Sequence, residues 1–360
     1  IMFRFFIIIV FLFSAQVSIA QYKPFIIKGI VDQFPDKTIV KLRDVENNKW
    51  IDSTFINNRQ FTLKAIQPKY NHASQYFLFV GDRDAVIPIL IENNEVLKLE
   101  FNDADFQNYS ILAAKNQHEY EELDSVFYEP YTTIIKNISL INTFKKQGSK
   151  KNIKQFKTII NAERNKVNNE ILHHKGSFVA MHYIANYINV LQPKKDILIE
   201  FLNSFDINSR NSKYAKAIQY YINPQKALLD DEMFDPNNSK INLGETFTRK
   251  YILLDIASYY CNYSQMARKN LEKIVQKYST QLDVVSIHVD NDLEGLRNYS
   301  TNHYPNWKFY YHPEGRFSNF YIKYQIIGTP TYYLFDQNKK LITSFQNNAE
   351  LEKQLSMFIK

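Results

Sequence analysis

The sequence predicts a chain of three parts: an N-terminal all-β sandwich, a middle α-helical segment and a C-terminal α/β domain. The first part holds short β-prone runs separated by turn formers, the second has a helical period, and the third alternates strands with helices. With 360 residues and 45% apolar content, the chain can build several cores. We assign residues 21–114 to the β-sandwich, 115–230 to the helical segment, 231–248 to a linker or lead-in strand, and 249–360 to the α/β domain.

The first twenty residues are expected to be a signal peptide and not part of the fold. Arg4 supplies a positive n-region, Phe5 to Phe13 form an apolar run, and Ser18-Ile19-Ala20 places small residues before a cleavage site at Gln21. The apolar run is shorter than the about 20 residues of a membrane span. We therefore expect residues 1–20 to be removed and the chain to be exported to the periplasm or cell envelope. An uncleaved N-terminal anchor is the alternative.

Seven short runs predict the strands of the β-sandwich. Several alternate apolar and polar residues, as Val96 to Phe101 does, and turn formers such as Asn57-Asn58 separate them. Regularly spaced short strands of this kind are typical of a sandwich or a partly closed barrel. The runs are residues 25–31, 38–42, 49–53, 61–65, 76–80, 87–91 and 96–101. No residue in them suggests catalysis.

The helical segment is predicted from apolar residues that recur at steps of three and four from Tyr120 to Ile134. Pro130 falls within this pattern and is expected to kink or divide the helix. Gly176-Ser177 marks a stop and a new N-cap before a helix over 178–191. Shorter helices are expected over residues 194–202 and 213–222.

Charge and motifs exclude several classes of function. The net charge of +7 is mild for this length, and the six lysines between Lys145 and Lys157 fit a solvated helix junction better than a nucleic-acid site. His173 and His174 are adjacent and point in different directions on a helix, so we expect no metal site. The sequence holds neither GxGxxG nor GxxxxGK[ST], so we expect no nucleotide cofactor and assign no cofactor at all.

The C-terminal domain is predicted from strands that alternate with helices. Strands are expected over residues 251–257, 282–289, 307–311, 331–335 and 341–345, and helices over 261–278, 293–300, 317–324 and 350–359. Two helices follow two strands before a final hairpin and helix, which is the order of an α/β sandwich.

One cysteine, Cys261, directly follows the first of these strands and opens the next helix. Unpaired backbone N–H groups and the positive end of the helix dipole lower the pKa of a thiol at that place and favour the thiolate. Asp255 lies inside the otherwise apolar run Ile252 to Ala257. A carboxylate there is costly unless it is used or hydrogen-bonded, and a strand-end or solvent-facing aspartate is the alternative.

Residues Tyr251 to Ser264 resemble the active-site segment of TlpA-type thioredoxins, in which W-C-x-x-C joins a strand to a helix. Gly328-Thr329-Pro330-Thr331 resembles the cis-proline loop of the same family. The resemblance covers residues 249–360 and implies a cis Thr329–Pro330 bond close to Cys261. It also implies that Asp255 is the buried acid that transfers protons. The upstream parts resemble the N-terminal extension of many secreted bacterial thioredoxin-like proteins.

Two residues depart from the family pattern. Tyr260 stands where the family has tryptophan, and Ser264 stands where it has the resolving cysteine. Ser264 can hydrogen-bond a Cys261 thiolate but cannot release a mixed disulfide, so an external thiol must do so. Tyr260, Thr329 and Pro330 are the candidate substrate-binding residues.

Two functions stay open at this point. The first is an extracytoplasmic thioredoxin-like thiol–disulfide oxidoreductase that acts through Cys261 alone, with Ser264 and Asp255 in the catalytic site and a protein or small-molecule thiol or disulfide as substrate. The second is a redox-inactive thioredoxin-fold module that binds another protein of the cell envelope. Neither function involves nucleic acid.

Overall fold

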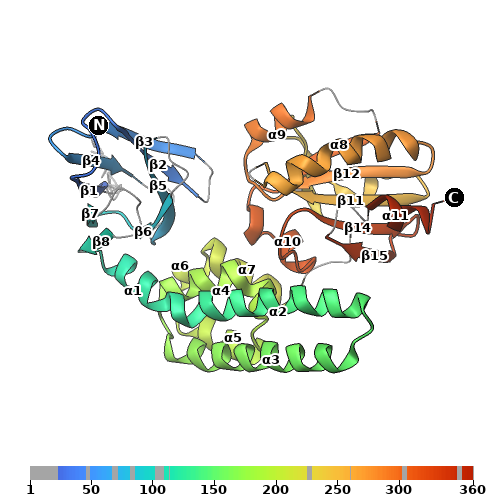
Figure 1. Cartoon of the computed structure of the whole chain (residues 1–360), viewed down its shortest axis with the longest axis horizontal. Helices are drawn as coiled ribbons and strands as arrows, with labels where there is room; N and C mark the ends of the chain where they lie inside the picture. The colour runs from blue at the N-terminus through green and yellow to red at the C-terminus, as the bar shows by residue number, and fades with distance from the viewer. Residues whose placement is uncertain are drawn as a thin grey trace, which may run out of the picture.

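The computed structural model describes residues 23–45, 49–66, 72–81, 86–101, 109–112, 114–224, 229–259, 261–301, 306–346 and 351–359. The expected signal peptide and its cleavage site lie outside these residues. The chain folds into a β domain, a helical segment and an α/β part, in that order, and the predicted fold class is confirmed. Both sheet-containing parts rest on the same side of the helical segment (Figure 1).

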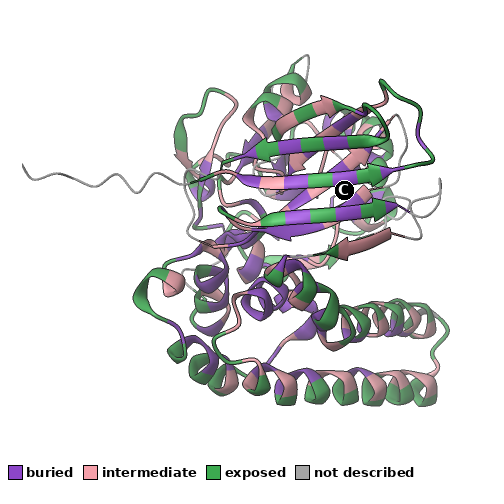
Figure 2. Cartoon of the chain, turned by 90° about the vertical axis from the view of Figure 1, so that its left-hand side faces the viewer, coloured by how far each residue is buried: buried purple, intermediate pink, exposed green. Residues whose placement is uncertain are grey.

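The β domain is a sandwich of two four-stranded sheets. One sheet has the order β4-β1-β7-β8 and the other the order β3-β2-β5-β6. Their inner faces form one core because buried and exposed residues alternate along most strands, as Figure 2 shows for the strands that face the viewer. The strands are β1 (Phe25–Val31), β2 (Ile39–Asp44), β3 (Lys49–Phe55), β4 (Gln60–Ala65), β5 (Ser74–Val80), β6 (Val86–Ile91), β7 (Val96–Phe101) and β8 (Tyr109–Leu112).

Strand β8 was not expected from the sequence. It is only four residues long, pairs with β7 alone, and buries none of its residues fully. An edge strand of this kind lacks the alternation of buried and exposed positions on which the sequence prediction depends.

The helical segment packs around α4, which is apolar on nearly every side and therefore buried. Pro130 lies in the first turn of α2 and follows a short π-helical stretch, because its missing N–H cannot bond to the carbonyl one turn earlier. The elements are α1 (Lys115–Leu123), the π-helix η1 (Asp124–Tyr128), α2 (Glu129–Lys146), α3 (Lys150–His173), α4 (Phe178–Leu191), α5 (Lys195–Asn203), α6 (Ile207–Arg210) and α7 (Lys213–Ile222).

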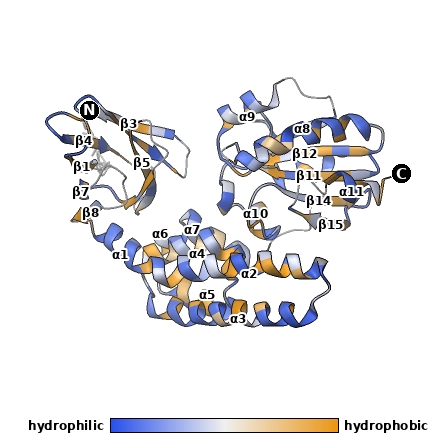
Figure 3. Cartoon of the chain, viewed as in Figure 1, coloured by the Kyte–Doolittle hydropathy of each residue, from blue (hydrophilic) through white to orange (hydrophobic). Residues whose placement is uncertain are grey.

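The α/β part is built on a seven-stranded sheet of order β10-β9-β13-β12-β11-β14-β15. Strands β11, β12 and β13 are parallel, while β9, β14 and β15 run antiparallel to their neighbours. The central strands β11 and β12 are largely hydrophobic because both faces of the sheet are covered (Figure 3). The strands are β9 (Glu232–Phe234), β10 (Lys240–Asn242), β11 (Tyr251–Ala257), β12 (Leu282–His288), β13 (Trp307–Tyr311), β14 (Thr331–Asp336) and β15 (Leu341–Phe345), and the helices are η2 (Leu243–Glu245), α8 (Asn262–Lys277), α9 (Leu293–Ser300), η3 (Gly315–Phe317), α10 (Asn319–Lys323) and α11 (Leu351–Ser356).

The segment expected to be a linker or lead-in strand forms the hairpin β9–β10 at the edge of this sheet. Just before β9, Asp231 receives a salt bridge of 2.8 Å from Lys323 of α10, and both side chains are only 5% exposed. The strands β9 and β10 of this segment are therefore part of the seven-stranded sheet.

The helical segment is attached to both neighbours by specific contacts. On the β-domain side, Leu90 N donates to the buried Gln117 Oε1 at 2.6 Å. On the α/β side, Asn189 Nδ2 donates to the carbonyl oxygens of Tyr321 at 3.1 Å and Ile326 at 3.0 Å. These bonds hold α4 against the loop that leads into β14.

Candidate active site

Cys261 lies where the sequence placed it, at the N-cap of α8 and four residues after β11 ends. Its thiol is partly exposed. Its Sγ donates to the carbonyl oxygen of Thr329, 68 residues further along the chain, at 3.2 Å. The Thr329–Pro330 peptide bond in that loop is cis. The fold thus brings together the two segments that the sequence singled out.

The surroundings of Cys261 favour its ionised form. Partial burial raises the pKa of the thiol, but hydrogen bonds from the side chains of Thr329 and Ser264 and from the backbone N–H groups of Ser264 and Tyr263 outweigh it, so the pKa lies below its ordinary value. Two of these groups are orphan N–H donors of the first turn of α8, which have no partner within the helix.

Ser264 is buried in the first turn of α8, with 3% of its surface exposed. Its Oγ accepts a hydrogen bond of 3.4 Å from Ser258 N, which links the helix to the end of β11. Ser264 therefore links the first turn of α8 to the residue that follows β11, and it also hydrogen-bonds Cys261. Tyr260, the other departure from the family pattern, lies outside the described residues.

Asp255 is a buried acid, only 1% exposed, and neither a strand-end nor a solvent-facing residue. Ser286, directly opposite on β12, donates to its Oδ2 at 2.6 Å, and Trp307 Nε1 donates to Ser286 Oγ at 3.0 Å. Burial raises the pKa of Asp255 to about 7, although the Ser286 hydrogen bond opposes this. Asp255 shares the sheet face of Leu253, which packs against α8, so it lies on the side of the sheet that α8 covers.

Asp290 supports the loop before Cys261, and sequence reasoning missed it. Its carboxylate accepts from Ser258 Oγ at 2.9 Å and from Tyr259 N at 2.7 Å. Asp290 follows the end of β12, the parallel neighbour of β11. The ends of adjacent parallel strands meet at one edge of a sheet, and that rule is the signal that could have found it.

A groove of about 590 Å³ lies beside Cys261 and is lined by Thr329, whose carbonyl oxygen accepts the hydrogen bond from Cys261 Sγ. One side consists of residues 327–330, with Tyr263 and Met266 of α8, and the other side consists of residues of α2. No pattern in the sequence indicated that α2 lies close to Cys261.

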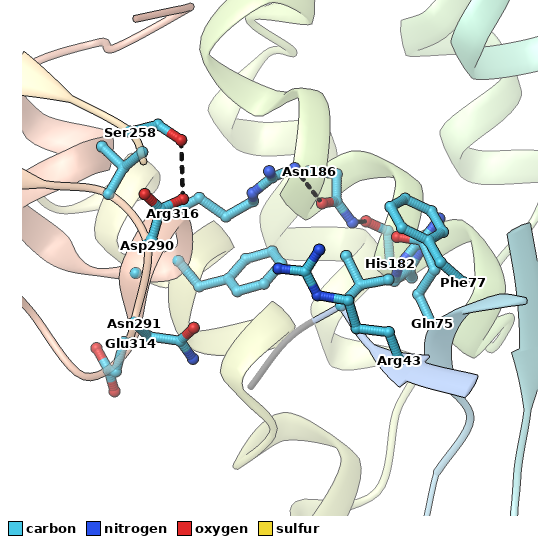
Figure 4. A pocket seen from close by; sticks show the side chains of 14 residues that line it. Arg43, Gln75, Phe77, His182, Asn186, Ser258, Asp290, Asn291, Glu314 and Arg316 are labelled. Carbon is cyan, nitrogen blue, oxygen red and sulfur yellow. Dashed lines mark hydrogen bonds between the residues drawn. The ribbon is translucent and has the colours of Figure 1, made fainter. Parts of the chain in front are cut away.

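A second, smaller pocket of about 210 Å³ lies where all three parts of the chain meet (Figure 4). Arg43 and Phe77 line it from the β domain, His182 from α4, and Asp290 and Arg316 from the α/β part. Arg316 donates to Asn186 Oδ1 at 3.5 Å, which is one of the two bonds drawn there. Ser258, three residues before Cys261, also lines this pocket.

The described part of the chain holds no candidate metal site, because no three of its His, Cys, Asp or Glu side chains lie together in a way that could bind a metal ion. His173 and His174 instead lie near Glu170 on the surface of α3. Among the described residues, no helix is long and apolar enough to cross a membrane.

Comparison with known proteins supports the C-terminal fold. Residues 249–341 match the sequence model of the thioredoxin-like family. This part of the chain is thioredoxin-like. A search of curated proteins finds no match.

Solved structures that resemble the chain do so over about a third of its length. A thiol-disulfide oxidoreductase from Bacteroides fragilis is 20% identical, with 36% of this chain and 96% of that chain covered and a TM-score of 0.32. The thioredoxin domain of a thiol-disulfide oxidoreductase from Bacteroides vulgatus is 16% identical, with 36% and 93% covered and a TM-score of 0.33. The exposed lipoprotein thioredoxin from Streptococcus pneumoniae is 15% identical, with 36% and 99% covered and a TM-score of 0.30.

Proposed function

We propose that this protein is an extracytoplasmic thiol–disulfide oxidoreductase of the thioredoxin-like type that acts through the single thiol of Cys261. The observation that carries the proposal is the setting of Cys261, at the N-cap of α8 with its Sγ 3.2 Å from the Thr329 carbonyl oxygen. Ser264 and Tyr263 lower the pKa of the thiol there, so an attacking thiolate is available at a lower pH than for an ordinary cysteine.

The reaction with one thiol is an exchange. The Cys261 thiolate attacks one sulfur of a substrate disulfide, a new S–S bond forms to Cys261, and the other substrate sulfur leaves as a thiolate. A second thiolate, from a small thiol or from another cysteine of the substrate, then attacks the substrate sulfur of this mixed disulfide and releases Cys261. Two S–S bonds form and two break, so the protein ends as it began. When the second thiolate is another cysteine of the substrate the result is isomerisation, and when it is a small thiol the disulfide passes to a mixed disulfide of substrate and small thiol.

The remaining site residues have supporting roles in this proposal. Asp255, whose pKa of about 7 suits it to hold or give up a proton near neutral pH, serves the protonation of the thiol and of the leaving thiolate. Ser264 stabilises the thiolate by hydrogen bonding. Thr329 and Pro330 contact the substrate beside the thiol, and Tyr260 stays a proposed substrate-binding residue on the sequence pattern alone.

One observation favours the second candidate, a redox-inactive binding module of the cell envelope. Ser264 fills the position of a resolving cysteine and is bonded into the fold through Ser258, so the site holds no second thiol to release a captured partner. In that case Cys261 would stay unreactive while the surface around it bound another envelope protein.

Refolding of a scrambled disulfide protein tests the proposal. The full chain is added to scrambled ribonuclease with a small thiol, and recovery of ribonuclease activity is followed for the wild type, for Cys261→Ser and for Ser264→Ala. We expect the wild type to accelerate recovery, Cys261→Ser to lose the acceleration, and Ser264→Ala to retain part of it. Equal recovery with the wild type and Cys261→Ser would reject the enzyme and favour the binding module.

A further inference from the structure

The groove beside Cys261 has one wall that comes from outside the thioredoxin-like part. Ile135, Ile138, Ser139 and Asn142 of α2 line it, opposite the loop of residues 327–330. Their spacing of three, one and three places all four on a single stripe of the helix. The stripe lies close to Cys261, because Thr329 lines the same groove and its carbonyl oxygen accepts the hydrogen bond from Cys261 Sγ.

The two walls are fixed relative to each other. Ile327, next to Gly328 of the cis-proline loop, packs against the helical core together with Ile135 and Ile138. The buried Asn189 of α4 bonds to the carbonyl oxygens of Tyr321 and Ile326 just before that loop. Core packing and buried hydrogen bonds therefore keep the loop of residues 327–330 at a fixed distance from the helical segment.

The described residues that line the groove carry no charge, and most of their side chains are apolar. Tyr263 and Met266 lie one turn apart on α8 and are 73% and 72% exposed, and with Ile135, Ile138 and Ile327 they give the groove an apolar lining that extends across both walls. Methionine adapts to varied apolar partners. Every residue that lines the groove within the described chain is neutral: Ile135, Ile138, Ser139, Asn142, Tyr263, Met266, Ile327, Gly328, Thr329, Pro330 and Gln346.

We infer that α2 is the second wall of a polypeptide-binding groove, and that the substrate is an extended chain segment whose cysteine reacts with Cys261 and whose flanking residues are uncharged and apolar. This inference rests on the proposed function. An extended segment fits because its backbone can pair with the loop of residues 328–330 while alternate side chains reach the apolar wall. Charged flanking residues would lose their hydration against Ile135 and Ile138 without gaining a partner.

The test uses synthetic peptides that carry one cysteine in a mixed disulfide with thionitrobenzoate. The Cys261 thiolate forms a disulfide with the peptide sulfur, the peptide's bond to thionitrobenzoate breaks, and the coloured thionitrobenzoate anion is released. One peptide has leucine and valine around its cysteine, a second has lysines, and the mixed disulfide of N-acetylcysteine serves as the small probe. The rate constant of release is measured with the full chain.

Two exposed positions on the α2 stripe allow the wall to be changed without disturbing the core: Ser139→Glu and Asn142→Glu, made together. We expect this variant to react about tenfold more slowly than the wild type with the apolar peptide. It should react faster than the wild type with the lysine peptide, because the new carboxylates attract its charges. The small probe should react within about twofold of the wild type. Asn161→Glu is the matched control, since Asn161 is exposed on α3 and does not line the groove.

The outcomes separate this inference from the proposed function. Unchanged peptide rates in the α2 variant, or equal slowing of all three probes, would overturn the role of α2 while Cys261 remained reactive. If wild-type Cys261 reacted with none of the three probes, the proposed function itself would be overturned. A higher rate constant of the α2 variant with the lysine peptide would support the inference, because simple damage to the fold would not raise any of the three rates.

Discussion

Replacement of Asp255 by asparagine should change how the stability of the α/β part depends on pH. The pKa of Asp255 is about 7 in the folded protein, against about 3.9 in an unfolded chain. The native state therefore binds the proton more tightly than the unfolded state, and the free energy of unfolding falls as the pH rises from about 4 to about 7. At about 1.4 kcal/mol per pKa unit, the wild type loses about 4 kcal/mol over that range because of this one group.

Asparagine removes this loss and keeps the nearby hydrogen bond. Its side-chain oxygen can accept from Ser286 Oγ as Asp255 Oδ2 does, while its NH₂ group replaces Oδ1, which has no hydrogen-bond partner among the residues that the structure describes. A buried donor without a partner costs about 1–3 kcal/mol at every pH. The free energy of unfolding of Asp255→Asn, relative to the wild type, should therefore rise by about 4 kcal/mol between pH 4 and pH 8, and the variant should be the more stable protein at pH 8.

Urea unfolding at several pH values measures this difference. Trp307 is buried in the same hydrogen-bonded network, and a Trp50→Phe background leaves it as the only tryptophan, so its fluorescence reports on the α/β part. In a second variant, Ser286→Ala, the loss of the hydrogen bond that lowers the pKa of Asp255 should move the fall in stability to higher pH. A difference between Asp255→Asn and the wild type that stays constant from pH 4 to pH 8 would refute the raised pKa.

Two other predictions concern the missing thiol and the hairpin before the thioredoxin-like part. Ser264→Cys should form an internal disulfide with Cys261 and give insulin-type reductase activity, because residues three apart at a helix N-terminus can bring their sulfurs within bonding reach. If both thiols of this variant stayed reduced in air, the prediction would be wrong. Asp231→Ala should lower the free energy of unfolding by about 3–5 kcal/mol, because it leaves Lys323 buried without its carboxylate. A change below about 0.5 kcal/mol, as expected at an exposed position in a linker, would show that this segment is not part of the folded unit.

Much of the fold could be predicted from local pattern. Ser177 was expected to begin a helix, and its side chain caps α4 by accepting from Ala180 N. The apolar run around Asp255 was expected to be a buried strand, and β11 is an inner strand of the sheet, between β12 and β14, with six of its seven residues buried. These features depend on residues close together in the sequence, where period and capping are informative.

The parts that could not be predicted depend on contacts between distant segments. The strands β9 and β10 have three residues each, and β9 pairs with the edge of the sheet that β13 forms. Asp290 and the α2 stripe reach the site of Cys261 through tertiary packing, across 29 and about 120 residues of chain. A single sequence does not show which surfaces meet, so α2 could be recognised only as an amphipathic helix.

The pH dependence of Cys261 alkylation tests the central claim most directly. Cys261 is the only cysteine of the chain, so the rate of reaction with iodoacetamide reports on it without any mutation. The folded protein is compared with the same protein in urea, in which the thiol should titrate near the ordinary pKa of about 8.5. The hydrogen bonds at the N-terminus of α8 predict a midpoint at lower pH in the folded protein than in urea. A midpoint equal to or above that of the unfolded chain would contradict the assignment of Cys261 as an activated nucleophile.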